Sequence, residues 1–348
     1  MGKTERFANF SILNAEHLEG ILMKSFRILS LLALLILAAC AHHQRIPSET
    51  ISTVYSTYAD SDAPVYSYAP LFLAYNYRSS YNRMGQPSAR YDDQGNEQIY
   101  IDNQKPVIFF LKKNFTTSKG RYTNLIYRIH FPKVPFRLIP FYLTAGKNVG
   151  LMVVITLDSQ QKPVLVTTVH TCGCYLVIVP TSFLPRDALP AKWREKPIRA
   201  YGETLPWLLD YSKTQDPKLL IHLRPGVHRV MDLEIIGKQE LQDFRRFNVI
   251  YADLKPAREL EKIPLDGGHT SFYHRKGLLK GYVKGSVKPL ESIFLSLVSL
   301  DFFVGTDKVY DDYHEYGNPF YTSLKPWNHN ASDMRNFAAF LKFWGWQL

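Results

Sequence analysis

The sequence predicts an α+β fold, with a mostly antiparallel β-sheet built from hairpins in the first two thirds and a helical C-terminal section. Three observations lead to this prediction. Short runs of β-branched and aromatic residues, bounded by glycine, proline, asparagine or lysine, recur after residue 105. Two turn-forming stretches each separate a pair of such runs. Beyond residue 289, apolar stretches have the length or the spacing of helices.

The expected strands are short and close together. They are PVIFFL (106–111), LIYRIHF (125–131) and GLMVVITL (150–157). The stretch DSQQKP separates the last run from VLVTTVH and predicts a β-hairpin. A second hairpin is predicted at RPG (224–226), between LLIHL and VHRVMDLEII. Proline fixes φ at one turn position, and glycine tolerates a positive φ at the next.

The remaining segments are irregular or helical. Five prolines between residues 180 and 217 predict a long excursion that interrupts the sheet. The stretch LESIFLSLVSLDFFV (290–304) is apolar enough for a buried helix, but its length and two acidic residues argue against a membrane span. Near the C-terminus, SDMRNFAAFLKFWGWQL has apolar residues at helical spacing. Ser332 is the expected N-cap and Gly345 the expected stop.

Between Met23 and Cys40 the chain reads MKSFRILSLLALLILAAC. A short basic segment, an apolar run too short to span a bilayer and small residues before a cysteine are typical of a secretory signal. The end of this stretch, Leu37-Ala38-Ala39-Cys40, resembles the lipobox of bacterial lipoproteins. The resemblance implies cleavage before Cys40 and acylation of its thiol. An anchor helix that happens to end in a cysteine is the alternative.

The leader sets the expected organisation. Residues 1–39 are expected to be the leader. Translation is expected to start at Met23, because residues 1–22 resemble no part of a secretory signal. Residues 40–69 are polar and rich in serine, threonine and tyrosine, which predicts a lipidated tether. Residues 70–348 are expected to form one α+β domain. Ala41, rather than an acidic residue, follows Cys40; in lipoproteins this implies the outer membrane, on a face that the sequence leaves open.

The charge of the chain favours anionic partners. The net charge is +11, and because residues 1–39 contain four basic and three acidic side chains, the remainder carries +10. Export excludes nucleic acid as a routine partner. Besides the membrane reached through the lipid anchor, anionic envelope polymers or another envelope protein are the expected partners. Solubility is the simpler explanation of the same charge.

The stretch HTCGCY (170–175) is the candidate site. On a strand, His170, Cys172 and Cys174 share one face, with Cα atoms two residues apart separated by roughly 6.4–6.8 Å. Once Cys40 is acylated, the other two cysteines are alone in an oxidising compartment, which favours a disulfide or redox pair. Closing so small a ring requires a bend, which Gly173 permits, and is expected to give a comparatively reducible bond.

Other interpretations of the same residues remain open. His170, Cys172 and Cys174 suit Zn²⁺ or Cu⁺, with His269 or His274 as a further ligand. Alternatively, they have no chemical role: the cysteines are small buried hydrophobic residues and His170 is a hydrogen-bonded residue of the core. A cysteine nucleophile activated by His170 is compatible with the spacing, although no orienting partner is visible.

Two further groups are weaker candidates. Asp307, Asp311, Asp312 and His314 lie close together, but they lack the calcium-loop pattern and favour a solvated acidic loop. Trp327, Trp344 and Trp346 are able to stack on sugars, although core packing is the simpler expectation. The chain contains no G-x-S-x-G, H-E-x-x-H or phosphate-loop motif. The sequence therefore predicts a binding or structural role in the envelope, with a metal, redox or catalytic role for HTCGCY as the alternative.

Overall fold

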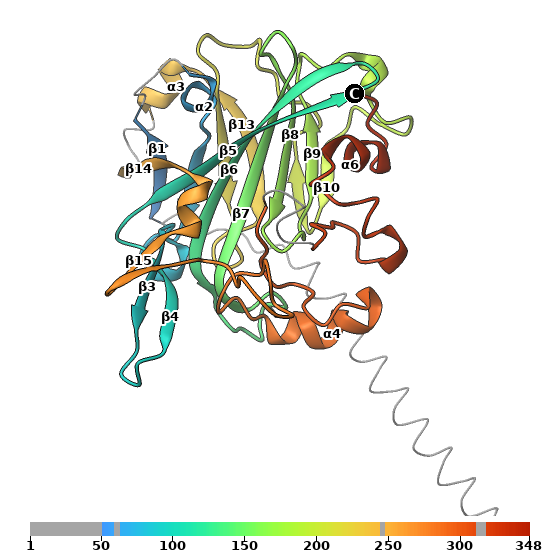
Figure 1. The fold of residues 1–348 in the computed structure, drawn as a ribbon. Helices are drawn as coiled ribbons and strands as arrows, with labels where there is room; N and C mark the ends of the chain where they lie inside the picture. The colour runs from blue at the N-terminus through green and yellow to red at the C-terminus, as the bar shows by residue number, and fades with distance from the viewer. Residues whose placement is uncertain (1–50, 59–62, 244–247, 311–317) are drawn as a thin grey trace, which may run out of the picture.

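Figure 1 shows the computed structural model, which describes residues 51–58, 63–243, 248–310 and 318–348. The expected leader, its start at Met23 and the lipidation site Cys40 lie outside the described residues. The acidic candidates Asp311, Asp312 and His314 lie outside them as well.

Ten strands form one curled sheet (Figure 1). In spatial order they are β13 (Val230–Ile236), β12 (Lys218–Leu223), β2 (Leu71–Tyr75), β1 (Ser52–Thr57), β14 (Asn248–Pro256), β5 (Val107–Thr117), β6 (Gly120–Val134), β7 (Gly146–Leu157), β8 (Pro163–His170) and β9 (Val177–Pro180). Most neighbours are antiparallel, as expected. The pairs β12–β2, β1–β14 and β14–β5 are parallel, so the sheet is mixed.

Smaller elements surround this sheet. Three two-stranded sheets are formed by β3 (Gln86–Tyr91) with β4 (Glu97–Asp102), β10 (Ile198–Ala200) with β11 (Glu203–Leu205), and β15 (Ile263–Leu265) with β16 (Gly268–Thr270). The α-helices are α2 (Pro64–Ser67), α3 (Lys238–Asp243), α4 (Pro289–Ser299) and α6 (Phe337–Phe343). Short 3₁₀ segments occur at 80–82, 186–188, 257–261 and 326–328.

The folded body begins earlier than the sequence predicted. The expected tether, residues 40–69, includes β1, which lies inside the sheet between β2 and β14. Within β1, Tyr55 is buried, and its hydroxyl accepts a hydrogen bond from the backbone N–H of Met84 at 3.2 Å. Threonine, valine and tyrosine are good strand formers, so a stretch that is polar in composition still forms a buried strand when its partners lie far away in the sequence.

Both predicted hairpins are present. At the β7–β8 turn, a carboxylate oxygen of Asp158 accepts hydrogen bonds from the backbone N–H groups of Gln160 and Lys162, and Gln161 adopts a φ of 61°. At the β12–β13 turn, Gly226 has a φ of 86°. The side-chain hydrogen bonds of Asp158 and the positive φ of Gly226 are what these turn residues favour, whereas a positive φ is uncommon for glutamine. Local sequence thus accounts for much of both connections.

Strands β6 to β8 are buried on both faces. Alternate side chains of β7, such as Val153 and Val154, enter two different hydrophobic clusters. The second cluster is completed by the C-terminal segment, with Phe337 and Phe340 of α6 packed against it. The C-terminal section therefore covers one face of the sheet, which explains why every residue of β8 is buried.

The C-terminal helix starts later than predicted. Its N-cap is Asn336, whose side chain accepts a hydrogen bond from the backbone N–H of Ala339. The expected cap, Ser332, instead accepts hydrogen bonds from the backbone N–H groups of Thr322 and Ser323. Gly345 ends the helix with a φ of 90°, as predicted.

The apolar stretch 290–304 forms α4, but that helix is not buried as predicted. Its two buried residues are Glu291 and Ser299, whereas Ile293 and Leu297 are exposed. Leu300 ends the helix in the left-handed region, with a φ of 50°. None of the helices among the described residues is long and apolar enough to cross a membrane.

Candidate functional site

The HTCGCY stretch forms a tight turn at the end of β8. Cys172 and Cys174 form the expected disulfide, with Cα atoms 5.6 Å apart, closer than a straight strand allows. The backbone N–H of His170 donates to the carbonyl oxygen of Cys174 at 2.9 Å, which closes the turn. Gly173 has a φ of 95°, and a Cβ at this position would collide with the carbonyl oxygen of Tyr321. Glycine is therefore required here for both conformation and space.

The expected metal ligands come together only in part. One ligand atom each from His170, Cys172 and Cys174 lies within 4.8 Å of the others, which is close enough for a shared metal ion. Among the described residues this is the one group with metal-binding proximity, and neither His269 nor His274 belongs to it. His269 is exposed on β16, and His274 lines a separate cleft. The structure therefore does not bring these two histidines to the group formed by His170, Cys172 and Cys174.

His170 is buried beside the disulfide. Its ring meets Tyr175 edge to face at 4.7 Å between centroids. Burial, reinforced by the positive charge of Lys288, lowers the pKa of His170 to about 3, so the imidazole is neutral at pH 7. Its Nε2 atom has no hydrogen-bond partner among the described residues. The ring thus retains one unsatisfied nitrogen next to the two sulfurs.

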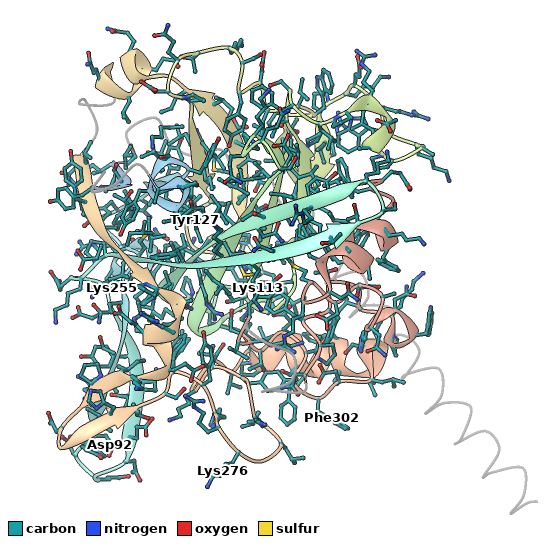
Figure 2. The ribbon with its side chains drawn as sticks, turned by 45° about the horizontal axis from the view of Figure 1, so that its top comes forward. Asp92, Lys113, Tyr127, Lys255, Lys276 and Phe302 are labelled. Carbon is teal, nitrogen blue, oxygen red and sulfur yellow. A yellow bond between two sulfur atoms is a disulfide. The ribbon has the colours of Figure 1, made fainter. Side chains whose placement is uncertain are left out.

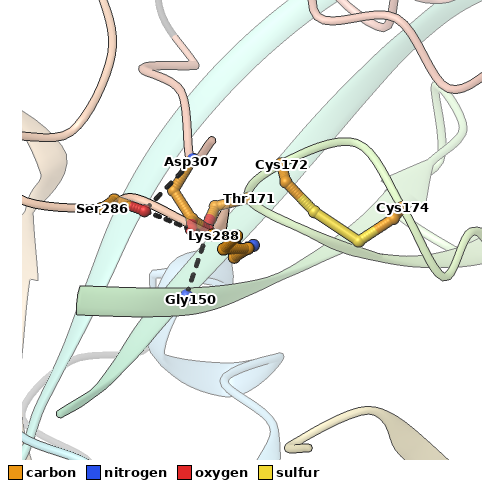
Figure 3. Close-up of a disulfide and its surroundings, with 7 residues drawn as sticks. All are labelled: Gly150, Thr171, Cys172, Cys174, Ser286, Lys288 and Asp307. Atoms are coloured by element: carbon orange, nitrogen blue, oxygen red, sulfur yellow. Dashed lines mark hydrogen bonds and ion pairs between the residues drawn. A yellow bond between two sulfur atoms is a disulfide. The ribbon is translucent and has the colours of Figure 1, made fainter. Parts of the chain in front are cut away.

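The centre of the site is the carboxylate of Asp307 (Figure 3). One oxygen accepts a hydrogen bond from the Thr171 hydroxyl and another from the backbone N–H of Gly150, the latter at 3.3 Å. The other oxygen accepts from the Ser286 hydroxyl at 2.6 Å and lies 3.1 Å from Nζ of Lys288. Burial alone would raise the pKa of Asp307, but Lys288 and the hydroxyl donors outweigh this effect and lower it.

Asp307 joins segments that are far apart in the sequence. Thr171 belongs to the disulfide turn, Gly150 to β7, and Ser286 and Lys288 to the chain that enters α4. Neither Thr171 nor Lys288 was singled out from the sequence, because a lone threonine and a lone lysine carry no motif. Asp307 was noted, but as part of a solvated acidic loop, and its complete burial corrects that expectation.

Lys308 is a second buried cation at the same site. Its Nζ lies 3.7 Å from the ring centroid of Tyr321 and 5.7 Å from that of Tyr282. Burial lowers the pKa of Lys308 to about 8, and its Nζ has no hydrogen-bond partner among the described residues. A lysine with a lowered pKa is a potential nucleophile. Here, however, the aromatic rings hold the ammonium group away from solvent.

These groups are too deeply buried to meet a substrate. His170, Lys288, Asp307 and Lys308 are each at most 2% exposed. The network therefore holds the disulfide turn against β7 and the α4 segment, and in this conformation it offers no access for catalysis.

A second site, not expected from the sequence, is an open cleft of about 820 Å³ between the β3–β4 hairpin and the adjoining ends of β6 and β7. Lys133 of β6 and Lys147 of β7 lie directly opposite each other across these strands. Like charges in such a pair are destabilising. Neither lysine has an ion-pair partner among the described residues, although Lys284, also in the cleft, pairs with Glu97 at 2.7 Å. The cleft therefore holds two uncompensated cations.

Asn148 joins the walls of the cleft. This residue adopts a φ of 52°, and its amide donates hydrogen bonds to the carbonyl oxygens of Ile99 and Lys284, at 3.1 and 3.0 Å. It ties the β3–β4 hairpin and residue 284 to the start of β7. Neither Lys133 nor Lys147 was singled out from the sequence, because their pairing depends on a register that the sequence does not reveal.

Comparison with known proteins adds no relative: no family model, curated protein or solved structure matches this chain.

Replacing Asp307 by asparagine should leave Lys288 buried without its ion-pair partner. We expect the free energy of unfolding to fall by about 3–5 kcal/mol, measured by urea denaturation at pH 7. As a control, Asp187→Asn removes the exposed partner of Lys119 and should cost less than about 1 kcal/mol. Equal losses in the two variants would contradict a central role for Asp307.

Proposed function

We propose that the mature protein is a lipoprotein anchored to the outer membrane through Cys40, and that its folded body binds an anionic group of the envelope in the cleft between the β3–β4 hairpin and β6–β7. The observation that carries this proposal is the facing pair Lys133 and Lys147, whose charges are not neutralised within the described residues. A protein accepts such repulsion at low cost when an anion bridges the two cations.

The charges of the cleft favour binding over catalysis. Its lining contains four cations, Arg90, Lys133, Lys147 and Lys284, against two carboxylates, Asp92 and Glu97. Both carboxylates are already engaged. Asp92 accepts hydrogen bonds from the backbone N–H groups of Gln94 and Asn96, and Glu97 pairs with Lys284. The cleft therefore presents positive charge without a free acid–base pair.

The disulfide supports an exported location. Structural disulfides persist in oxidising compartments and are rare in the bacterial cytosol. The Cys172–Cys174 bond is therefore consistent with a leader that exports the chain, and it leaves Cys40 as the cysteine for acylation.

The HTCGCY turn supports a second candidate function, a metal or redox site. In the reduced state, two thiolates and the neutral imidazole of His170 would offer three ligands suited to Zn²⁺ or Cu⁺. The unsatisfied Nε2 of His170 favours this candidate. The disulfide and the burial of the site make it secondary to the cleft.

Cys40→Ala should abolish acylation, because the alanine has no thiol to receive the lipid. The variant is expected to accumulate as an uncleaved precursor or to be lost from the outer-membrane fraction. Incorporation of a labelled fatty acid and membrane fractionation measure the two effects. Unchanged labelling and fractionation would refute the anchor.

Reversing both lysine charges with Lys133→Glu and Lys147→Glu should weaken binding of a polyanion. With short-chain inorganic polyphosphate as the probe, we expect a loss of roughly tenfold or more, from about 1 kcal/mol per lysine. The control Lys192→Glu with Lys196→Glu changes the net charge equally at exposed positions outside the cleft. Equal losses in the two double variants, measured by calorimetry at fixed salt, would show that only net charge matters.

Reduction should convert the HTCGCY turn into a metal site if the second candidate is correct. The reduced protein is then expected to retain one Zn²⁺ per chain after gel filtration, as measured by elemental analysis. The oxidised protein and the reduced Cys172→Ser, Cys174→Ser variant should retain none. The absence of zinc from the reduced wild-type protein would exclude a metal role.

A further inference from the structure

We propose that the end of the sheet that bears the cleft docks onto a phospholipid surface, so that the anions bound in the cleft are phospholipid head groups. This inference rests on the lipid anchor and on the cleft proposed above, and it names the partner of that same site.

The first observation is the inverted character of α4. This helix turns Glu291 and Ser299 toward the protein, while Ile293 and Leu297 are 66% and 82% exposed. The turn that follows exposes Phe302. Residues four apart lie on the same face of a helix, so Ile293 and Leu297 form one apolar stripe. An exposed apolar stripe of this kind marks a surface that an apolar partner is able to cover.

The second observation is the loop between β6 and β7. Phe136, Leu138 and Ile139 are all exposed, and Ile139 is 88% exposed. The loop starts directly after β6, which carries Lys133, and ends at β7, which carries Lys147. Three apolar side chains therefore project beside the two unpaired lysines of the cleft.

These two apolar segments lie at the same end of the molecule. The start of β7 contacts the chain entering α4, because a Cβ at Gly146 would lie 2.7 Å from both Lys288 Cγ and the carbonyl oxygen of Val287. In Figure 1, α4 and the β3–β4 hairpin both lie at the lower end, where β7 begins. Figure 2 shows Phe302 at the lower edge of the molecule. We name these exposed side chains the basal surface: Phe136, Leu138, Ile139, Ile293, Leu297 and Phe302.

Charge complementarity favours a lipid bilayer as the occupant. Apolar side chains beside lysines match the two layers of an anionic membrane surface, acyl chains below and phosphates above. Arg137, within the β6–β7 loop, adds a third cation among the apolar residues. A purely apolar partner would leave these cations without counter-charges.

The length of the tether also favours a bilayer. Eleven residues, 41–51, separate Cys40 from Ser52. They span at most about 40 Å when fully extended, so an acylated Cys40 keeps the folded body within reach of the membrane at all times. A contact made at such a high effective concentration needs little affinity of its own.

Site-specific photo-crosslinking tests this proposal with the lipidated protein. A diazirine amino acid is placed at Leu297, at Leu138 or, as a control, at Ser118 in the β5–β6 turn, which lies at the upper end in Figure 1. Each protein is reconstituted into vesicles of phosphatidylcholine with phosphatidylglycerol. We expect several times more crosslinked lipid from positions 297 and 138 than from position 118. Replacing phosphatidylglycerol by phosphatidylcholine, or introducing Lys133→Glu with Lys147→Glu, should reduce these yields.

Equal lipid labelling at all three positions would overturn the docking proposal. So would crosslinks from positions 297 and 138 that lead mainly to a second copy of the chain. If acylation and polyphosphate binding are intact in the same preparation, such results reject the docking alone. A protein that is not acylated would instead fail to enter the vesicles, which rejects the proposed anchor.

Discussion

The buried carboxylate of Asp307 is the interaction on which the arrangement of both sites depends. Removing a charge from water is expensive, and the cost is offset only where enough donors converge. Asp307 meets this condition with two hydroxyl groups, a backbone N–H and the ammonium group of Lys288. Ser286 and Lys288 directly precede α4, while Lys284 and Gly285 line the cleft. One electrostatic cluster thus positions the disulfide turn, the exposed helix and one wall of the cleft.

The fold was predictable where its contacts are local. The two hairpins follow from Asp158, whose side chain closes the first turn, and from Gly226, which adopts a positive φ in the second. Gly345 ends the last helix with a positive φ in the same way. The position of β1 was not predictable, because its partner β14 is far away in the sequence and a polar composition gives no indication of pairing. The stretch 290–304 shows a different limit. Apolar composition indicates that a surface avoids water, but not whether the protein or something else covers it.

At the candidate site, too, the local features were predictable and the long-range contacts were not. The cysteine pair was predictable from the expected export of the chain and from Gly173, since the first argument needs only the leader sequence and the second only a residue between the two cysteines. Its main support was not, because Thr171 and Asp307 are separated by 136 residues and meet only in the folded chain. The two cleft lysines face each other because β6 and β7 pair in one register, which a shift of one residue would destroy.

The central position of β1 sets an order for assembly. Its antiparallel partner β2 is the next strand in the chain and begins at Leu71, so one edge of β1 can pair early in synthesis. Its other edge pairs with residues 248–252 and stays open until almost three quarters of the chain has been synthesised. An open strand edge is a template for pairing with other chains. The ten-stranded sheet therefore closes late, around β1, the first of its strands in the chain. A chain interrupted before β14 would leave one edge of β1 exposed in the middle of the sheet.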